Sequence, residues 1–342
     1  MRDIRFPLLA LLLVSGLIYL YAGSVPDRHH LIEELSANED HDDHERYPVP
    51  PHEGIVFQHK QEDLHMKLEE KEYEKFSNLR QWLGSYESSS KLDDNSARKK
   101  VVLVSGCDYY DPEILEKSLQ NREEYCSRHE GVVHHFVNFT SYPTVESPQW
   151  KKLHAIEEAF AEYPDAEWVW WLDIDAIIMN SQVNVTRDIL HPTVLKDQIT
   201  YDHPIRNIDS KFEGHKYPSK HSIRIKEIGF VISQDSLGLN AGSFFIRRSK
   251  PGARLLQLWK DMKHGTSFKR AEQDALIEIM LQHGSLLKRT ALVPQRTFNS
   301  YHDDSYSHIW RYREGDFVVH FAGKSGDKRY KEIYNRYFSE RN

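Results

Sequence analysis

The most informative stretch of the chain is residues 168–180, WVWWLDIDAIIMN, in which a very apolar run leads into Asp173-Ile174-Asp175. An unbroken apolar run of this kind is typical of a strand buried on both faces. Side chains of a strand alternate between its faces, so two aspartates one residue apart are expected to point the same way. A divalent cation such as Mn²⁺ or Mg²⁺, which prefers oxygen ligands, relieves the repulsion between them. The stretch therefore predicts a metal site; the alternative is a pair of solvated turn aspartates.

Strand and helix patterns alternate around this stretch. The predicted strands are residues 99–106, 132–138 and 166–172, and the predicted helices are residues 111–129 and 150–163. Asp111-Pro112 is expected to open the first helix as its cap and first residue. This alternation is typical of an α/β domain with a mainly parallel sheet, in which ligands bind beyond the carboxyl ends of the strands.

A third metal ligand is expected near the C-terminus, within residues 316–326, DFVVHFAGKSG. His320 ends a short apolar strand, and the small residues after it allow a backbone to approach a phosphate. A single strand histidine is more often a core residue. The loop that follows, with Gly323 and the cation of Lys324, favours the interpretation as a binding site.

The N-terminal hundred residues differ in character from the rest. Residues 6–23 are apolar, with Arg2 and Arg5 before them and acidic residues after them. At about 1.5 Å per residue, this run is long enough for a short transmembrane helix with a cytosolic N-terminus, and its length suits a Golgi bilayer. A cleaved signal peptide is the alternative. The expected organisation is a tail (1–5), a membrane anchor (6–23), a lumenal stem (24–97, with a helix near 61–83) and an α/β domain (98–342).

Composition excludes several classes of protein. The 342 residues are 39% hydrophobic, which is enough for a core, and the formal charge of −7 offers no electrostatic footprint for nucleic acid. Two cysteines, Cys107 and Cys126, exclude a disulfide scaffold, and two free thiols are favoured over a bond between them. The sequons at Asn138 and Asn184 fit a lumenal domain, and Asn138, at a strand end, is expected to be the better acceptor.

Four motifs in this order resemble glycosyltransferase family 34: residues 168–180, residues 239–247 (LNAGSFFIR), residues 272–276 (EQDAL) and residues 320–323 (HFAG). This family contains fungal α-1,2-galactosyltransferases, α-1,6-mannosyltransferases and plant xyloglucan xylosyltransferases. The resemblance covers residues 101–326. It implies a GT-A type catalytic domain, with a Rossmann-like sheet flanked by helices, behind a type II Golgi anchor and a stem.

The resemblance also implies a role for each matching residue. Asp173 and Asp175 resemble the D-x-D pair of the family, and His320 resembles its third metal ligand. The other implied positions are Lys152 and Lys324 at the donor diphosphate, Asn240, Ala241 and Gly242 along the donor-sugar pocket, and Glu272, Gln273 and Asp274 near the reacting carbon. Two structural alternatives stay open: Asn240 satisfying a turn, and Glu272 capping a helix. Family members commonly have Cys-Lys where this chain has Lys324-Ser325.

The activity implied by the resemblance is metal-dependent, retaining transfer of a hexose from a nucleotide sugar to mannose-containing glycans in the Golgi. Galactose from UDP-galactose in an α-1,2 linkage is favoured over α-1,6 transfer of mannose from GDP-mannose by a subunit of a mannan polymerase complex. A non-catalytic glycan-binding subunit is a second alternative, and a homodimer or hetero-oligomer with related transferases stays open. Same-face displacement, in which the leaving phosphate accepts the acceptor's proton, is favoured over Asp274 or Glu272 as covalent nucleophile.

Overall fold

The computed structural model describes residues 101–108, 110–142, 147–206, 216–263, 268–302, 308–324 and 326–342. The predicted anchor at residues 6–23 and the stem helix near residues 61–83 lie outside these ranges. Within the described ranges, no helix is both long enough and apolar enough to cross a membrane.

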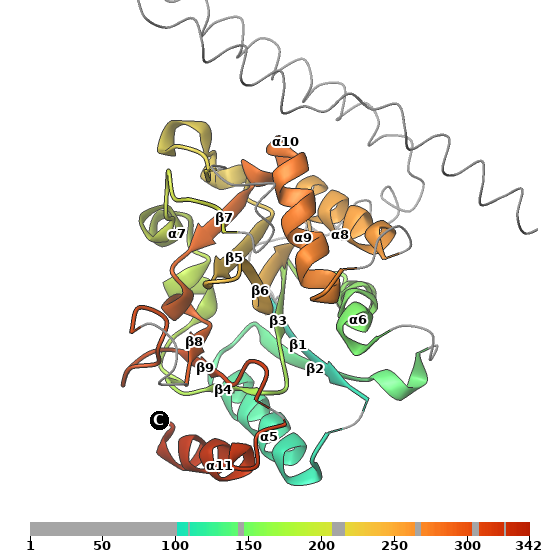
Figure 1. Cartoon of the computed structure of the whole chain (residues 1–342), viewed down its shortest axis with the longest axis vertical. Helices are drawn as coiled ribbons and strands as arrows, with labels where there is room; N and C mark the ends of the chain where they lie inside the picture. The colour runs from blue at the N-terminus through green and yellow to red at the C-terminus, as the bar shows by residue number, and fades with distance from the viewer. Residues whose placement is uncertain are drawn as a thin grey trace, which may run out of the picture. The chain divides into compact units, whose positions relative to one another are not determined.

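A six-stranded mixed sheet forms the centre of the described domain (Figure 1). Its strands, in spatial order, are β2 (Val132–Asn138), β1 (Val101–Cys107), β3 (Trp168–Leu172), β6 (Leu239–Arg247), β5 (Phe230–Gln234) and β7 (Thr290–Val293). The pairs β1–β2, β1–β3 and β5–β7 are parallel, whereas β6 runs antiparallel to both of its neighbours. The prediction of a mainly parallel sheet is therefore confirmed, with β6 as the reversed strand.

Strand β3 is buried on both faces, as its apolar sequence predicts. The Trp170 ring stacks on Phe245 and Phe317, with centroids 5.4 and 5.3 Å away. Trp171 points to the other face, where its ring is stacked 6.3 Å from Phe139. Both tryptophans are almost completely buried. Because adjacent strand residues face opposite sides, a run without polar residues requires cover on both sides of the sheet.

Helices provide that cover. They are α5 (Pro112–Arg128), α6 (Pro148–Glu162), α7 (Pro192–Gln198), α8 (Lys250–Met262), α9 (Ala271–Gln282), α10 (Gly284–Leu287) and α11 (Tyr330–Glu340). Helices α6, α8 and α9 contact one another beside the sheet, and α11 packs on α5 (Figure 1). The predicted start of α5 is confirmed, because the Asp111 carboxylate accepts hydrogen bonds from the backbone N–H groups of Glu113 and Ile114.

A second, three-stranded sheet joins the middle of the chain to its C-terminus. Its strands, in spatial order, are β4 (Ala176–Ile178), β9 (Val318–His320) and β8 (Ser300–Tyr301). In the antiparallel β4–β9 pair Ala176 lies opposite His320, and in the parallel β8–β9 pair Tyr301 lies opposite the same histidine. This register brings His320 beside the turn that precedes β4.

Candidate active site

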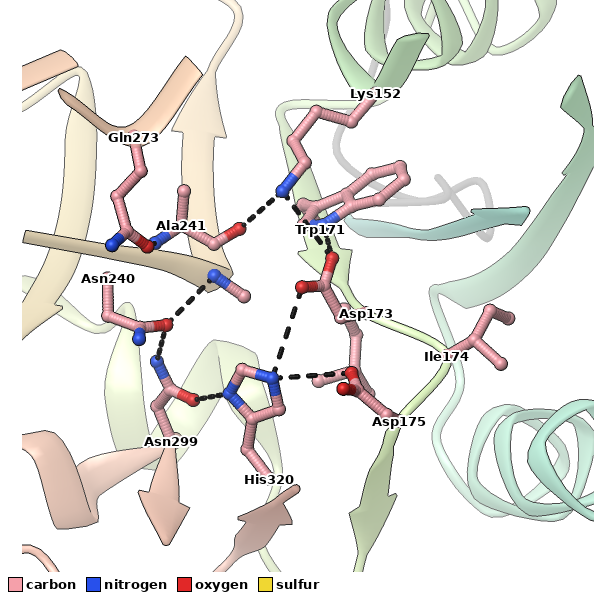
Figure 2. A network of polar contacts seen from close by, with 12 residues as sticks. Lys152, Trp171, Asp173, Ile174, Asp175, Asn240, Ala241, Gln273, Asn299 and His320 are labelled. Atoms are coloured by element: carbon pink, nitrogen blue, oxygen red, sulfur yellow. Dashed lines mark hydrogen bonds and ion pairs between the residues drawn. The ribbon is translucent and has the colours of Figure 1, made fainter. Parts of the chain in front are cut away.

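Asp173 and Asp175 lie in the turn between β3 and β4. Strand β3 ends at Leu172 and β4 begins at Ala176, so the alternation of strand side chains is not what aligns the two carboxylates, and that part of the expectation was wrong. The turn itself aligns them: the Asp173 N–H donates to Gly242 O (2.8 Å), and the Ala176 N–H donates to Asp173 O (3.1 Å). Both carboxylates consequently lie on the side of His320 (Figure 2).

Two side chains of α5 hold this turn from behind. Arg122, fully buried, donates to Asp173 O (2.7 Å), and the Ser118 hydroxyl donates to Ile174 O (2.8 Å). Sequence reasoning did not single out either residue. The available signal is their i, i+4 spacing, which places two polar groups on one face of a helix.

Asp173, Asp175 and His320 form a cluster with the chemistry of a metal site. His320 Nε2 lies 3.3 Å from Asp175 Oδ1 and 3.9 Å from Asp173 Oδ2, and one ligand atom from each residue lies within 4.8 Å of the others. The histidine side chain is buried, whereas the side chains of Asp173 and Asp175 are 30% and 19% exposed. Two carboxylates and one imidazole fit a Mn²⁺ or Mg²⁺ ion, and the exposed carboxylate side leaves room for further ligands.

The electrostatics of the cluster agree with this reading. Burial alone would lower the pKa of His320, but the carboxylates of Asp175 and Asp173 outweigh it, so the pKa is raised. Burial opposes ionisation of Asp175, yet the facing imidazole holds the pKa of that carboxyl below its ordinary value. The site thus stabilises a positive charge beside its two carboxylates, and a bound cation would supply such a charge.

Lys152 lies behind the carboxylates in a buried ion-pair network. Its Nζ is 2.7 Å from Glu272 Oε1 and 3.5 Å from Asp173 Oδ1, and it donates to Ala241 O at 3.0 Å. Burial disfavours the ammonium, but Asp173 and Glu272 together raise the pKa of Lys152, so it stays charged. Trp171, which sequence reasoning did not assign to the site, donates its Nε1–H to Asp173 Oδ1 (2.6 Å).

Asn240, Ala241 and Gly242 lie in β6 beside this network. Gln273 Oε1 accepts a hydrogen bond from the Ala241 N–H (2.9 Å), which ties the start of α9 to the strand (Figure 2). A Cβ atom on Gly242 would lie 2.1 Å from His320 Cε1. The glycine therefore makes room for the histidine ring, a reason for its small size that the sequence did not indicate.

Asp274 and Lys324 are placed by contacts of their own. Asp274 pairs with Arg270: its Oδ1 accepts from the Arg270 Nε–H (2.7 Å), and its Oδ2 accepts from the Arg270 backbone N–H (2.9 Å). Lys324 is half-buried in the turn after β9, where its N–H donates to Phe321 O (3.0 Å). Glu272 instead belongs to the network, through Lys152.

The cysteines and sequons are placed as follows. Cys107 is buried and Cys126 half-buried, both are free, and burial raises the pKa of these thiols to about 11 and about 12. Free thiols, the favoured interpretation, are thereby confirmed. Asn138 is exposed at the end of β2, whereas Asn184 is half-buried and its amide nitrogen lies 3.2 Å from His129 Nδ1.

A cavity of about 550 Å³ lies at the opposite end of β3, lined by Trp168, Arg247 and residues of α7. It contains none of the predicted site residues. We place the candidate site at the carboxylate end because the charged and polar side chains converge there.

Comparison with known proteins identifies the family. Residues 97–330 match the galactosyl transferase GMA12/MNN10 family. An α-1,2-galactosyltransferase of Schizosaccharomyces pombe is 31% identical over 258 residues, which cover 72% of this chain and 67% of that protein. The probable α-1,6-mannosyltransferase MNN10 of Saccharomyces cerevisiae is 30% identical over 223 residues, covering 60% of this chain and 54% of that protein. A crystal structure of a glycosyltransferase involved in the glycosylation of the major capsid of PBCV-1 aligns with a TM-score of 0.49 at 17% identity, covering 69% of this chain and 98% of that one. The resemblance drawn from the four motifs is confirmed, and the chain belongs to the galactosyl transferase GMA12/MNN10 family.

Proposed function

We propose that this protein is a metal-dependent, retaining α-hexosyltransferase that transfers galactose from UDP-galactose to mannose-containing glycans in an α-1,2 linkage. The observation that carries the proposal is the convergence of Asp173, Asp175 and His320 at one end of the sheet. Family membership supports hexosyl transfer, and the α-1,2-galactosyltransferase relatives support this donor and linkage.

The same proposal gives the domain a GT-A fold. In support, β1, β2 and β3 are parallel, and the carboxylates follow the carboxyl end of β3, where ligands of open α/β sheets bind. Lys152 of α6 and Gln273 of α9 lie at the same end of the sheet, where each forms a hydrogen bond with the backbone of Ala241 in β6.

Asp173, Asp175 and His320 would hold Mn²⁺ or Mg²⁺, and a bound cation supplies neutralising charge for the diphosphate as it leaves. Lys152 adds a fixed buried positive charge beside Asp173 and keeps that carboxylate in place. Gln273 holds the backbone of Ala241, which would line the sugar side of the site. These residues are held in position before the substrate binds, so little reorganisation accompanies the reaction.

Same-face displacement needs no carboxylate nucleophile. It agrees with the contacts of Glu272 and Asp274, the two carboxylates that would act as nucleophile in the alternative mechanism. Glu272 is buried and paired with Lys152, and Asp274 is paired with Arg270. Each would have to break an ion pair before attacking the anomeric carbon. In the proposed route the leaving phosphate accepts the proton of the acceptor hydroxyl, and neither carboxylate forms a bond to the sugar.

The alternatives are α-1,6-mannosyl transfer from GDP-mannose, which the relationship to MNN10 favours, and a non-catalytic subunit of a polymerase complex. Either alternative is compatible with a homodimer of this protein or with a hetero-oligomer that it forms with related transferases. The intact three-ligand cluster favours a catalytic role, because a glycan-binding subunit does not need it. We also propose a Golgi location with residues 6–23 as a type II anchor, in accordance with the charges that flank them.

The test uses the purified full-length chain with Mn²⁺, a panel of UDP- and GDP-sugars and a mannoside acceptor, scored by nucleotide release and product mass. We expect one donor to be transferred and Asp175→Asn to abolish transfer. The matched control is Asp165→Asn, an exposed aspartate before β3 whose loss is expected to leave the rate unchanged. Failure to transfer any donor, in a chain that binds Mn²⁺, would refute the stand-alone enzyme.

A further inference from the structure

A chain of buried polar side chains lies behind His320, on the side away from the carboxylates. His320 Nδ1 is 2.8 Å from Asn299 Oδ1, and Asn299 Nδ2 donates to Asn240 Oδ1 at 2.9 Å. Asn240 Nδ2 in turn donates to Asp235 Oδ2 at 3.0 Å. All four residues are at least 95% buried. Part of this chain, from Asn240 to His320, is visible in Figure 2.

Two groups that cannot reverse their roles determine the orientation of the Asn240 amide. The Gly242 backbone N–H can only donate, and it donates to Asn240 Oδ1 at 2.9 Å. The carboxylate oxygen Oδ2 of Asp235 accepts from Asn240 Nδ2. Turning the amide over would set oxygen against oxygen at Asp235 and nitrogen against nitrogen at Gly242. Asn240 therefore presents its oxygen to Asn299.

Tyr301 supports the same orientation. Its hydroxyl donates to Asp235 Oδ2 at 2.5 Å and accepts from Asn240 Nδ2 at 2.6 Å, so it also requires a nitrogen on that side of Asn240. With these bonds, the oxygen of Asn240 accepts from two groups of the protein, and its amide nitrogen donates toward the adjacent oxygens of Asp235 and Tyr301. Asn240 is only 5% exposed, and its oxygen and its nitrogen are each held by groups of the protein, which favours its structural role over its role as a donor-pocket contact.

The orientation passes from Asn240 to His320 through Asn299. Because Asn240 presents an oxygen, Asn299 must turn its NH₂ group toward it and its own oxygen toward the histidine. An oxygen that faces Nδ1 can only accept, so it favours the neutral imidazole that carries its proton on Nδ1, in competition with the carboxylates that face Nε2 when no cation is bound. The lone pair on Nε2 then points at Asp173 and Asp175, where a cation would bind.

We propose that Asp235, Asn240 and Asn299 are positioning residues that hold His320 in the tautomer able to bind a metal. This role rests on the proposed function and deepens it. The three residues would determine the metal affinity of the site and would not contact the substrate. Without the relay a neutral imidazole can place its proton on Nε2, and that proton would occupy the metal position. Outer-shell partners that orient a ligating histidine commonly change metal affinity by about 10–100-fold.

The decisive variant is Asn299→Leu, which keeps a similar volume and removes the acceptor at Nδ1. The tautomer of His320 is read by ¹⁵N NMR of the histidine-labelled full-length chain in alkaline, metal-free buffer, with the signal assigned by its loss in His320→Ala. Mn²⁺ dissociation constants are measured separately by electron paramagnetic resonance. We expect the share of the Nε2–H form to rise in Asn299→Leu relative to the wild type, and the dissociation constant to rise about 10–100-fold.

Two further variants separate positioning from general damage. Asn121→Leu removes another buried amide, which exchanges two hydrogen bonds with the backbone of Ile178 and contacts neither the histidine nor the carboxylates. It is expected to lose stability and to keep the tautomer and the Mn²⁺ affinity. Asn299→Asp retains an acceptor at Nδ1, so it is expected to keep the Nδ1–H tautomer even though its carboxylate faces the oxygen of Asn240.

An Asn299→Leu chain with an unchanged tautomer and the Mn²⁺ affinity of Asn121→Leu would overturn the relay. A wild-type chain that binds no Mn²⁺ would instead refute the proposed metal site. The tautomer comparison tests the relay in either case, so the two failures are distinguishable.

Discussion

Gly242→Ala is the substitution that tests the architecture of the site most directly. A Cβ atom built on Gly242 lies 2.1 Å from Cε1, 2.8 Å from Nδ1 and 2.9 Å from Nε2 of His320. Ordinary van der Waals contact begins at 3.4 Å, so restoring it requires the ring and the strand to separate by about 1.3 Å (3.4 minus 2.1). A movement of this size breaks the 2.8 Å hydrogen bond to Asn299 and displaces Nε2 from Asp175.

The expected costs follow from this displacement. Overpacking a buried site costs about 1–3 kcal/mol of unfolding free energy. Displacing a ligand atom by about 1 Å is expected to reduce transfer by about 10²-fold, and the Mn²⁺ affinity is expected to fall by at least about tenfold. Urea unfolding, Mn²⁺ titration and a transfer assay measure these three quantities on the same preparation. The control is Gly284→Ala, because an added Cβ there meets nothing within 4 Å.

The results also distinguish two reasons for the glycine. If Gly242 only admits the donor sugar, the alanine variant loses transfer and keeps its Mn²⁺ affinity. If it makes room for His320, both fall together. A Gly242→Ala chain with wild-type stability and wild-type Mn²⁺ affinity would refute the packing of glycine against histidine on which the site is built.

Three further predictions concern other groups. Burial lowers the pKa of His134 from an ordinary 6.5 to about 4, so on acidification the unfolded chain takes up a proton at this histidine before the folded chain does. The unfolding free energy should therefore fall as the pH drops from 6.5 to 4, by about 3 kcal/mol at most. An equal slope in His134→Leu would contradict this. Lys152→Met leaves Glu272 buried without its cation and should lower the unfolding free energy measured in urea by about 3–5 kcal/mol. Adding Glu272→Leu should restore most of that free energy, and no recovery in the double variant would contradict the pairing. In a secretory host, Asn138→Gln should remove a glycan, seen as a change in gel mobility, whereas Asn184→Gln should leave the glycans unchanged. Asn184→Gln should instead lower the unfolding free energy by about 1 kcal/mol, because the Asn184 side chain caps the short helix that follows it. The reverse pattern would contradict the exposures of the two sites.

Local physics accounts for the parts of the structure that the sequence predicted. A strand without polar residues, such as β3, requires cover on both faces, and Asp111-Pro112 begins a helix through its own backbone geometry. The aspartates and His320 were identified because each lies beside an apolar strand in a recognisable motif. These signals need no knowledge of distant residues.

Tertiary structure decided how those residues are used. The β4–β9 register sets His320 beside the carboxylates, and it depends on strands far apart in the chain. Asn299 carries no motif, and its role appears only once β6 and the segment before β8 are packed together. By itself the sequence determined the fold class, the family and the three ligand candidates. Which polar atoms remain for a ligand depended on pairing between distant segments, because hydrogen bonds are satisfied in space and local sequence patterns do not report them.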